Sequence, residues 1–107
     1  MMALLLKVKW KMKKIDSDYQ KYILELYVNG DSFISNRAIK SIKKVCENEL
    51  ENRVTLTIID VNKNPELVLE HNILALPVLI RQSPLPKRQI IGDLQDYDRI
   101  LKGLDIR

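Results

Sequence analysis

The chain has 107 residues, 46% of them hydrophobic and 30% charged, which is typical of a single globular domain with a modest core. Its single cysteine, Cys46, excludes an internal disulfide, a CxxC redox pair and a zinc site built from several thiolates, and it favours a reducing, cytoplasmic compartment. The net charge of +4 comes from the lysines of the first 21 residues, whereas the rest of the chain is balanced, so we expect no nucleic-acid-binding face.

The first residues allow two interpretations. Residues 6–13 read Leu-Lys-Val-Lys-Trp-Lys-Met-Lys, an alternation that predicts a strand with apolar groups on one face and ammonium groups on the other. A loosely ordered extension before a start at Met12 fits equally well. We assign residues 1–21 as a basic N-terminal extension and residues 22–107 as the domain. The opening apolar stretch precedes its lysines, the reverse of a secretory signal, and no apolar run approaches the ~20 residues of a membrane span.

The next elements predict a strand–helix–strand unit. Tyr22–Val28 is nearly all apolar and ends at the turn residues Asn29-Gly30-Asp31, which indicates a buried strand. A helix capped by Ser32 or Ser35 should follow, because apolar residues recur at three- and four-residue steps: Ile39, Ile42, Cys46 and Leu50. Val54–Val61 then predicts a central strand, and the crossover between the two strands should be right-handed.

A short helix and a strand open the second half. Asn64-Pro65-Glu66 predicts a helix start in which Asn64 caps, and the helix should run to about His71. The apolar run Ala75–Ile80 contains Pro77, which lacks an amide proton and must begin a strand or lie at an edge. Residues 83–86 (Ser-Pro-Leu-Pro) then form a stiff turn.

The chain should end on a strand and a helix. Arg88–Ile91 predicts a short strand that ends at Gly92, and Asp93 is a candidate cap for a last helix with Gly103 near its end. The apolar side of that helix consists of Leu94, Tyr97, Ile100, Leu101 and Leu104. The predicted class is therefore α/β, a single thioredoxin-like domain with the element order βαβαββα.

Five segments carry a family resemblance over about residues 22–105. They are Leu26-Tyr27-Val28-x-Gly30, Arg37-Ala38, Ile59-Asp60-Val61-x-Lys63-Asn64-Pro65, Ile73-Leu74-Ala75-x-Pro77 and Arg88-x-Ile90-Ile91-Gly92-Asp93-Leu94. In this order and spacing they resemble the KaiB family of circadian-clock proteins. The resemblance implies a protein without enzymatic activity or cofactor that binds a KaiC-type ATPase ring and assembles other regulators upon it. It also implies a resting form that differs in the half after the second helix and associates into dimers or tetramers.

The resemblance suggests residues for these roles. Arg37, Lys40, Lys63 and Asn64 match positions expected at the ring-binding surface, although a solvated helix face and a simple cap would explain them too. Three further residues would determine the fold: Pro77, Gly92 and Asp93. The chain departs from the family in its more apolar segment 29–35, in Leu76 and in the lack of an acidic tail, which leaves the partner open.

A KaiB-like sensor module in histidine-kinase or stress signalling is the alternative function. A thioredoxin-type oxidoreductase is not expected, because residues 31–35 contain no cysteine where the redox pair should lie. His71 is the only histidine, so we expect no metal site.

Overall fold

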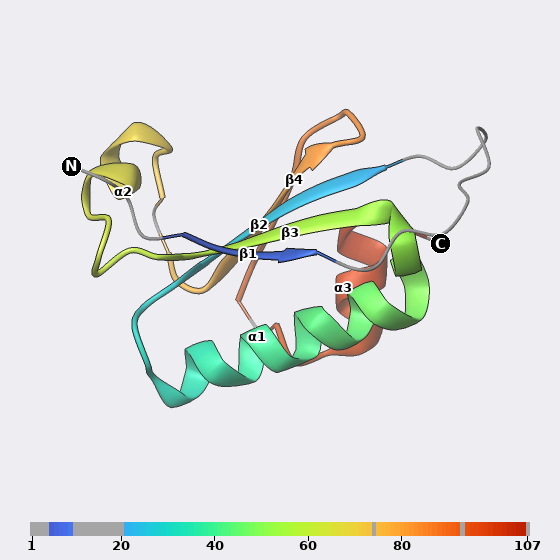
Figure 1. Ribbon diagram of the computed structural model, residues 1–107, viewed down its shortest axis with the longest axis horizontal. Helices are drawn as coiled ribbons and strands as arrows, with labels where there is room; N and C mark the ends of the chain where they lie inside the picture. The colour runs from blue at the N-terminus through green and yellow to red at the C-terminus, as the bar shows by residue number, and fades with distance from the viewer. Residues whose placement is uncertain (1–4, 10–20, 74, 93, 107) are drawn as a thin grey trace.

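The computed structural model describes residues 5–9, 21–73, 75–92 and 94–106 (Figure 1). Its regular elements, in chain order, are β1 (Leu5–Lys9), β2 (Tyr22–Val28), α1 (Phe33–Val45), a π-helical turn (Cys46–Leu50), a 3₁₀ turn (Glu51–Arg53), β3 (Val54–Asp60), α2 (Glu66–Glu70), β4 (Val78–Ser83), β5 (Arg88–Ile91) and α3 (Tyr97–Gly103).

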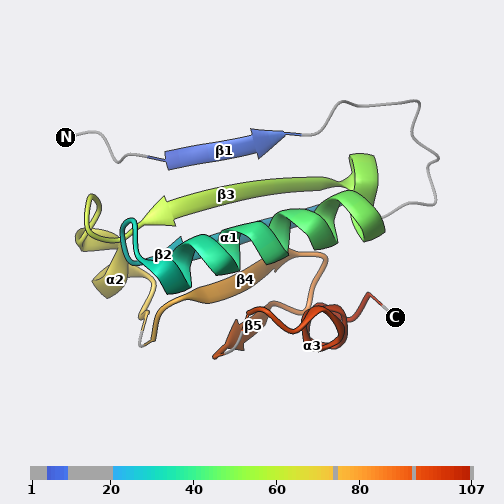
Figure 2. The ribbon, with the colours of Figure 1, turned by 90° about the horizontal axis from the view of Figure 1, so that it is seen from below.

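The strands form one mixed sheet in the order β1-β3-β2-β4-β5. The central strands β2 and β3 are parallel, with register from Tyr22 opposite Val54 to Val28 opposite Asp60, and α1 makes the crossover between them. The pairs β1–β3, β2–β4 and β4–β5 are antiparallel. Figure 2 shows α1 running along the sheet, with α3 and α2 beside its two ends.

Alternation along the strands divides the core between the two faces of the sheet. The larger cluster lies where α1 and α3 cover the sheet, and it joins Leu24, Leu26 and Leu56 to helical residues such as Ile42 and Ile100. The smaller cluster lies on the other face, where Leu67 and Val68 of α2 pack against it; its buried members are Tyr27, Ile59, Val61, Ile73, Val78 and Ile80. Within the described part of the chain, this second face is covered by one short helix, α2, near one end of the sheet.

The predicted order βαβαββα is present, preceded by the additional strand β1. The alternating segment is therefore a strand over residues 5–9, and residues 10–13 lie outside the described part of the chain. Because β1 pairs with β3 through five residue pairs, the sheet reaches into the segment that the sequence assigned as an extension. No helix among the described residues is long and apolar enough to cross a membrane.

Two predicted helix caps differ from the structure. Pro65, and not Asn64, occupies the N-cap position of α2, and this cap position makes no side-chain hydrogen bond. The cap of α3 is Asp96, whose carboxylate accepts a hydrogen bond from the Arg99 amide at 3.2 Å. Asp93 lies outside the described residues. At α1, Ser32 is the cap, one of the two predicted candidates.

Two of the residues predicted to determine the fold lie next to strands. Pro77 is buried, directly precedes β4 and follows a cis Leu76–Pro77 peptide bond. Gly92 follows β5 with φ of +106°, a conformation that glycine adopts without strain. The buried guanidinium of Arg81 in β4 donates hydrogen bonds to the carbonyls of Leu104 and Pro86, which ties the end of α3 and the turn before β5 to the sheet.

Candidate functional site

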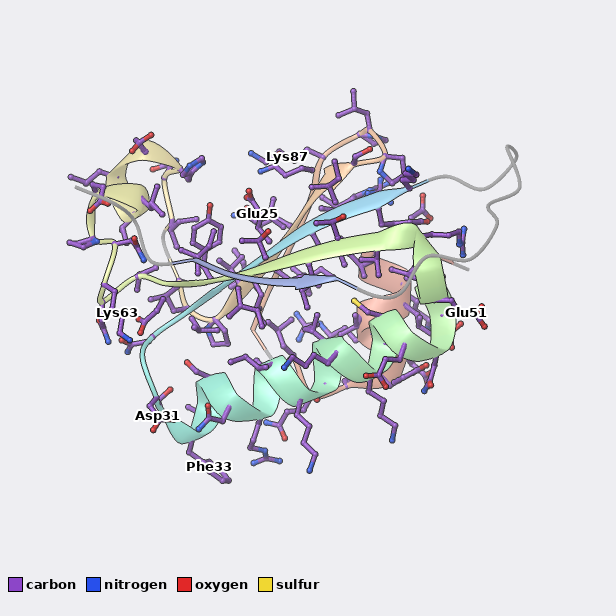
Figure 3. The ribbon with its side chains drawn as sticks, in the orientation of Figure 1. Glu25, Asp31, Phe33, Glu51, Lys63 and Lys87 are labelled. Atoms are coloured by element: carbon purple, nitrogen blue, oxygen red, sulfur yellow. The ribbon has the colours of Figure 1, made fainter. Side chains whose placement is uncertain are left out.

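Three segments meet at one end of the sheet. They are residues 29–32 after β2, residues 61–65 after β3 and residues 75–77 before β4. The register brings them together, since Val61 donates a hydrogen bond to the Val28 carbonyl at 3.0 Å and Tyr27 pairs with Val78. In open α/β sheets, the carboxyl ends of parallel strands are the usual place for binding sites. Figure 3 shows Asp31, Phe33 and Lys63 at this end of the molecule.

Asp60 fixes the two turns to each other. Its Oδ1 accepts hydrogen bonds from the backbone amides of Gly30 at 3.0 Å and of Asn62 at 2.9 Å. Gly30 has φ of +61°, and a Cβ at this position would lie 2.7 Å from Nδ2 of Asn62. The positive φ therefore favours glycine, and the Asp60 carboxylate joins the two turns into a single hydrogen-bonded unit.

Lys63 and Asn64 take opposite places on this unit. Asn64 is fully buried and donates from Nδ2 to the Asp60 carbonyl at 2.9 Å, so it braces the turn from inside. Its side chain is not available to a partner in this fold, and its contribution to binding would be to the shape of the turn. Lys63 is exposed, and its backbone amide donates to the Asp60 carbonyl at 3.1 Å. The turn thus holds an exposed ammonium group on an ordered backbone.

Hydrogen bonds also order the start of α1. The Ser32 hydroxyl accepts from the Ser35 amide at 3.1 Å, and the buried Ser35 hydroxyl accepts from the Asn29 amide at 3.0 Å. Because Ser35 takes the inward position, Phe33 and Ile34 point outward, with 72% and 61% of their surfaces exposed. Figure 3 shows the Phe33 side chain directed away from the body of the protein.

Arg37 and Lys40 continue the exposed side of α1. The Arg37 guanidinium carbon lies 5.1 Å from the centre of the Phe33 ring, a cation–π arrangement at a solvated site. Lys40 follows one turn later and is exposed. The helix therefore presents an aromatic ring followed by cations.

A pocket of about 350 Å³ lies between α1 and the turn after β3. Its lining combines apolar side chains (Val28, Ile39 and Ile58) with polar ones (Asp31, Asn36 and Lys63). Of the four predicted binding residues, only Lys63 lines the pocket. Arg37 and Lys40 lie on α1 outside it, and Asn64 is buried beneath the turn. The structure thus places three exposed cations around one end of the sheet rather than in one cavity.

Among the described residues we find neither a reactive thiol nor a metal site. The thiol of Cys46 is fully buried at the far end of α1, and burial followed by the charge of Glu47 raises its pKa to about 12. Within the described ranges, no group of three or more His, Cys, Asp or Glu side chains is placed to hold a metal ion. What the surface offers is charge and exposed apolar area, which suit binding to another protein.

Three apolar residues of this surface were not predicted as binding residues. They are Phe33, Ile34 and Leu76, the last with 37% of its surface exposed just before Pro77. The signal in the sequence was the apolar character of residues 29–35 at a helix start, where polar residues are usual. We call Phe33, Ile34, Arg37, Lys40, Lys63 and Leu76 the strand-end surface.

Comparisons with known proteins identify relatives of the whole domain. The family model described as "KaiB domain" matches residues 25–106. The circadian clock oscillator protein KaiB of Synechococcus elongatus is 48% identical over 90 residues, which cover 84% of this chain and 88% of the relative. KaiB of a Nostoc species is 48% identical over 85 residues, 79% of each chain.

Solved structures show the same fold at lower identity. The N-terminal domain of Synechococcus elongatus SasA superposes with a TM-score of 0.65 at 21% identity, covering 91% of this chain and 95% of that domain. Chloroplastic thioredoxin z superposes with a TM-score of 0.66 at 21% identity, covering 81% and 79%. The predicted thioredoxin-like fold is confirmed by these superpositions.

Proposed function

The chain belongs to the KaiB family, and from this premise we propose that it is a non-enzymatic, clock-type regulatory protein that binds a KaiC-type ATPase and modulates its assembly with other regulators. The observation that carries the proposal is the strand-end surface. It combines exposed apolar groups with three cations: Lys63 lies on a turn that hydrogen bonds order, and Arg37 and Lys40 lie on α1.

The composition of this surface suits a protein partner with an acidic rim around an apolar site. Phe33, Ile34 and Leu76 would supply most of the affinity, because apolar and aromatic groups dominate binding energy when they are buried at an interface. Arg37, Lys40 and Lys63 would steer the encounter and exclude partners of the wrong charge. Rigid turns reduce the entropy lost on binding, which favours this end of the molecule over a mobile loop.

The test is a charge reversal on the rigid turn. Lys63→Glu should weaken binding of the ATPase about tenfold or more, because it places like charge against an acidic rim. The melting temperature should stay nearly unchanged, since Lys63 is exposed and its backbone contacts persist. Lys87→Glu, the same change on the exposed turn before β5, is the matched control and should bind like the wild type. Calorimetric titration of the purified ATPase measures all three.

Equal affinity of wild type and folded Lys63→Glu would show that Lys63 is only a solvated residue. A wild-type chain that binds no KaiC-type ATPase would overturn the proposal. That result would favour the alternative, a KaiB-like sensor module in histidine-kinase or stress signalling without a full clock.

Three further properties are proposed on the family premise. The half after α2 would adopt a second arrangement in a resting state, with Pro77, Gly92 and Asp93 near the points where the backbone path changes. The resting form would be a homodimer or homotetramer. The protein would act in the cytoplasm, which agrees with a free, buried Cys46. Light scattering on the purified chain across a concentration series tests the oligomer.

A further inference from the structure

The edge of β3 is unusually suited to pairing with another strand. Residues 54–59 read Val-Thr-Leu-Thr-Ile-Ile, six uncharged residues rich in β-branched side chains, and Asp60 is the first charge. One side of β3 pairs with β2, and the other side would be open if β1 were absent. A long, uncharged edge strand is a template for a strand from another molecule.

The strand β1 closes this edge with features that natural sheets use to stop further pairing. It is two residues shorter than β3 and carries Lys7 and Lys9 in five residues. Lysines on a short edge strand oppose the addition of another strand. With β1 in place, the outer edge of the sheet is therefore a short strand with two lysines, whereas without β1 it would be β3, which is uncharged over residues 54–59.

The segment that joins β1 to β2, residues 10–21, is long enough for β1 to reach a β3 other than its own. Lys9 pairs with Thr55, and Tyr22 pairs with Val54, so β1 ends and β2 begins at the same end of the sheet. Their separation is two strand spacings, about 10 Å. The twelve residues between them (10–21) could span roughly 40 Å when extended, so β1 can also reach the β3 of a neighbouring molecule.

The strand β1 is an addition to the family domain. The family match covers residues 25–106. In the sheet order, β1 is the terminal strand and pairs with β3 alone. It is therefore an edge strand outside the residues that match the family.

We propose that the β3 edge is a strand-docking site that β1 occupies in cis and that the β1 strand of a second copy of this chain occupies in trans. The same register serves both cases, because the incoming strand has the same sequence. Two copies that exchange β1 form a closed, reciprocal dimer, since each outer edge is again the lysine-bearing strand. This inference does not depend on the proposed ATPase partner.

The first test removes β1 from the edge in the full-length chain. Successive amides of an antiparallel edge strand alternate toward and away from the partner, so Lys7→Pro/Val8→Pro must remove one hydrogen bond of the ladder. The control Lys7→Thr/Val8→Ile keeps every amide and the strand propensity. The probe is a fluorescent peptide with the sequence of residues 3–11, followed by anisotropy against each protein.

The proline variant should bind the peptide at least about tenfold tighter than the wild type or the control, because their tethered strand competes at a millimolar effective concentration. A scrambled peptide of the same composition should not bind. Equal binding by the wild type and the folded proline variant, or by the scrambled peptide, would overturn the proposal. Loss of cooperative unfolding in the proline variant would also overturn it, since β1 would then be part of the core.

The second test shortens the tether. Deleting residues 10–20 leaves only Lys21 between β1 and β2, a connection of at most ~7 Å, which cannot span the two strand spacings of about 10 Å. Because β1 can then reach only a neighbour's β3, we expect light scattering to show a dimer that is lost when Lys7→Pro/Val8→Pro is added to the same variant. A monomer at every concentration would overturn the exchange in trans.

Discussion

The fold suppresses the ionisation of two buried side chains, Cys46 and Tyr27. Desolvation is the larger cause in both. The charge of Glu47 adds to it at Cys46, and the charge of Glu25 and its hydrogen bond with the Tyr27 hydroxyl at 3.3 Å raise the pKa of Tyr27 further. At neutral pH the thiol is therefore protonated and, being fully buried, unreactive.

These groups should make the protein less stable in alkaline solution. The pKa of Cys46 is about 12 in the fold and has its ordinary value near 9 in the unfolded chain, so the unfolded chain loses the proton first. Stability from this group is complete below about pH 8.5 and falls as the pH rises toward 12, by up to about 1.4 kcal/mol per pH unit. Urea unfolding at pH 8, 9 and 10 measures the slope.

Cys46→Ala is the control for this prediction, because it removes the titrating thiol. Its free energy of unfolding should be lower at pH 8, owing to the lost packing, but should fall less steeply than that of the wild type up to pH 10, because Tyr27 remains to titrate. The same slope in wild type and Cys46→Ala would show that the thiol is not responsible.

At the level of residues, the sequence predicted exposure better than hydrogen-bond partners. Arg37, Lys40 and Lys63 are exposed, as the pattern of charges indicated. Asn64 was predicted as a cap and is instead buried against the Asp60 carbonyl. An asparagine side chain before a proline can either cap a helix or donate a hydrogen bond within the preceding turn. Only the path of the backbone decides which of the two it does.

At the level of elements, the junction of β2, β3 and α1 depends on the carboxylate of Asp60. Asp60→Ala should lower the free energy of unfolding by about 1–3 kcal/mol, because the amides of Gly30 and Asn62 lose their acceptor. Asp60→Asn retains an Oδ1 acceptor and should cost less. Urea unfolding of both variants measures the difference. Equal losses would show that the amide oxygen of asparagine cannot replace the Asp60 carboxylate oxygen as acceptor.

Most elements could be predicted because their apolar residues recur at regular intervals. The strand Tyr22–Val28 has the predicted bounds, and the central strand ends at Asp60, one residue before the predicted end. The predicted continuation of the first helix to Leu50 is a π-helical turn after Val45. Its apolar spacing still buries Cys46 and Leu50, so periodicity could not distinguish the two kinds of helix.

At the level of the whole molecule, the position of β1 was the part that the sequence left open. Alternation predicted a strand but not its partner, because pairing with β3 joins residues about fifty positions apart and depends on which sheet edge is free. The strand-end surface was likewise only partly predictable. Its cations were found by family resemblance, whereas Phe33, Ile34 and Leu76 became visible only as exposed apolar area.

Deleting residues 1–11 should leave a folded domain, because the strands and helices from Tyr22 onward already account for a sheet and its covering helices. Thermal unfolding should stay cooperative, with a melting temperature lower by roughly 4–8 °C for each kcal/mol that β1 contributes. Circular dichroism on heating measures this. A broad, non-cooperative transition would show that β1 is an integral strand of the domain.

The antiparallel pairing of β1 with β3 also sets an order of events during synthesis. Leu5 leaves the ribosome first, but its partner Ile59 follows roughly fifty residues later, which at 5–20 residues per second is a delay of about 3–10 s. During this time β2 and α1 are made, whereas β1 has no edge to join. The lysines at positions 7 and 9 would keep the waiting strand hydrated, so the charges that end the sheet in the finished protein also protect the nascent chain from premature association.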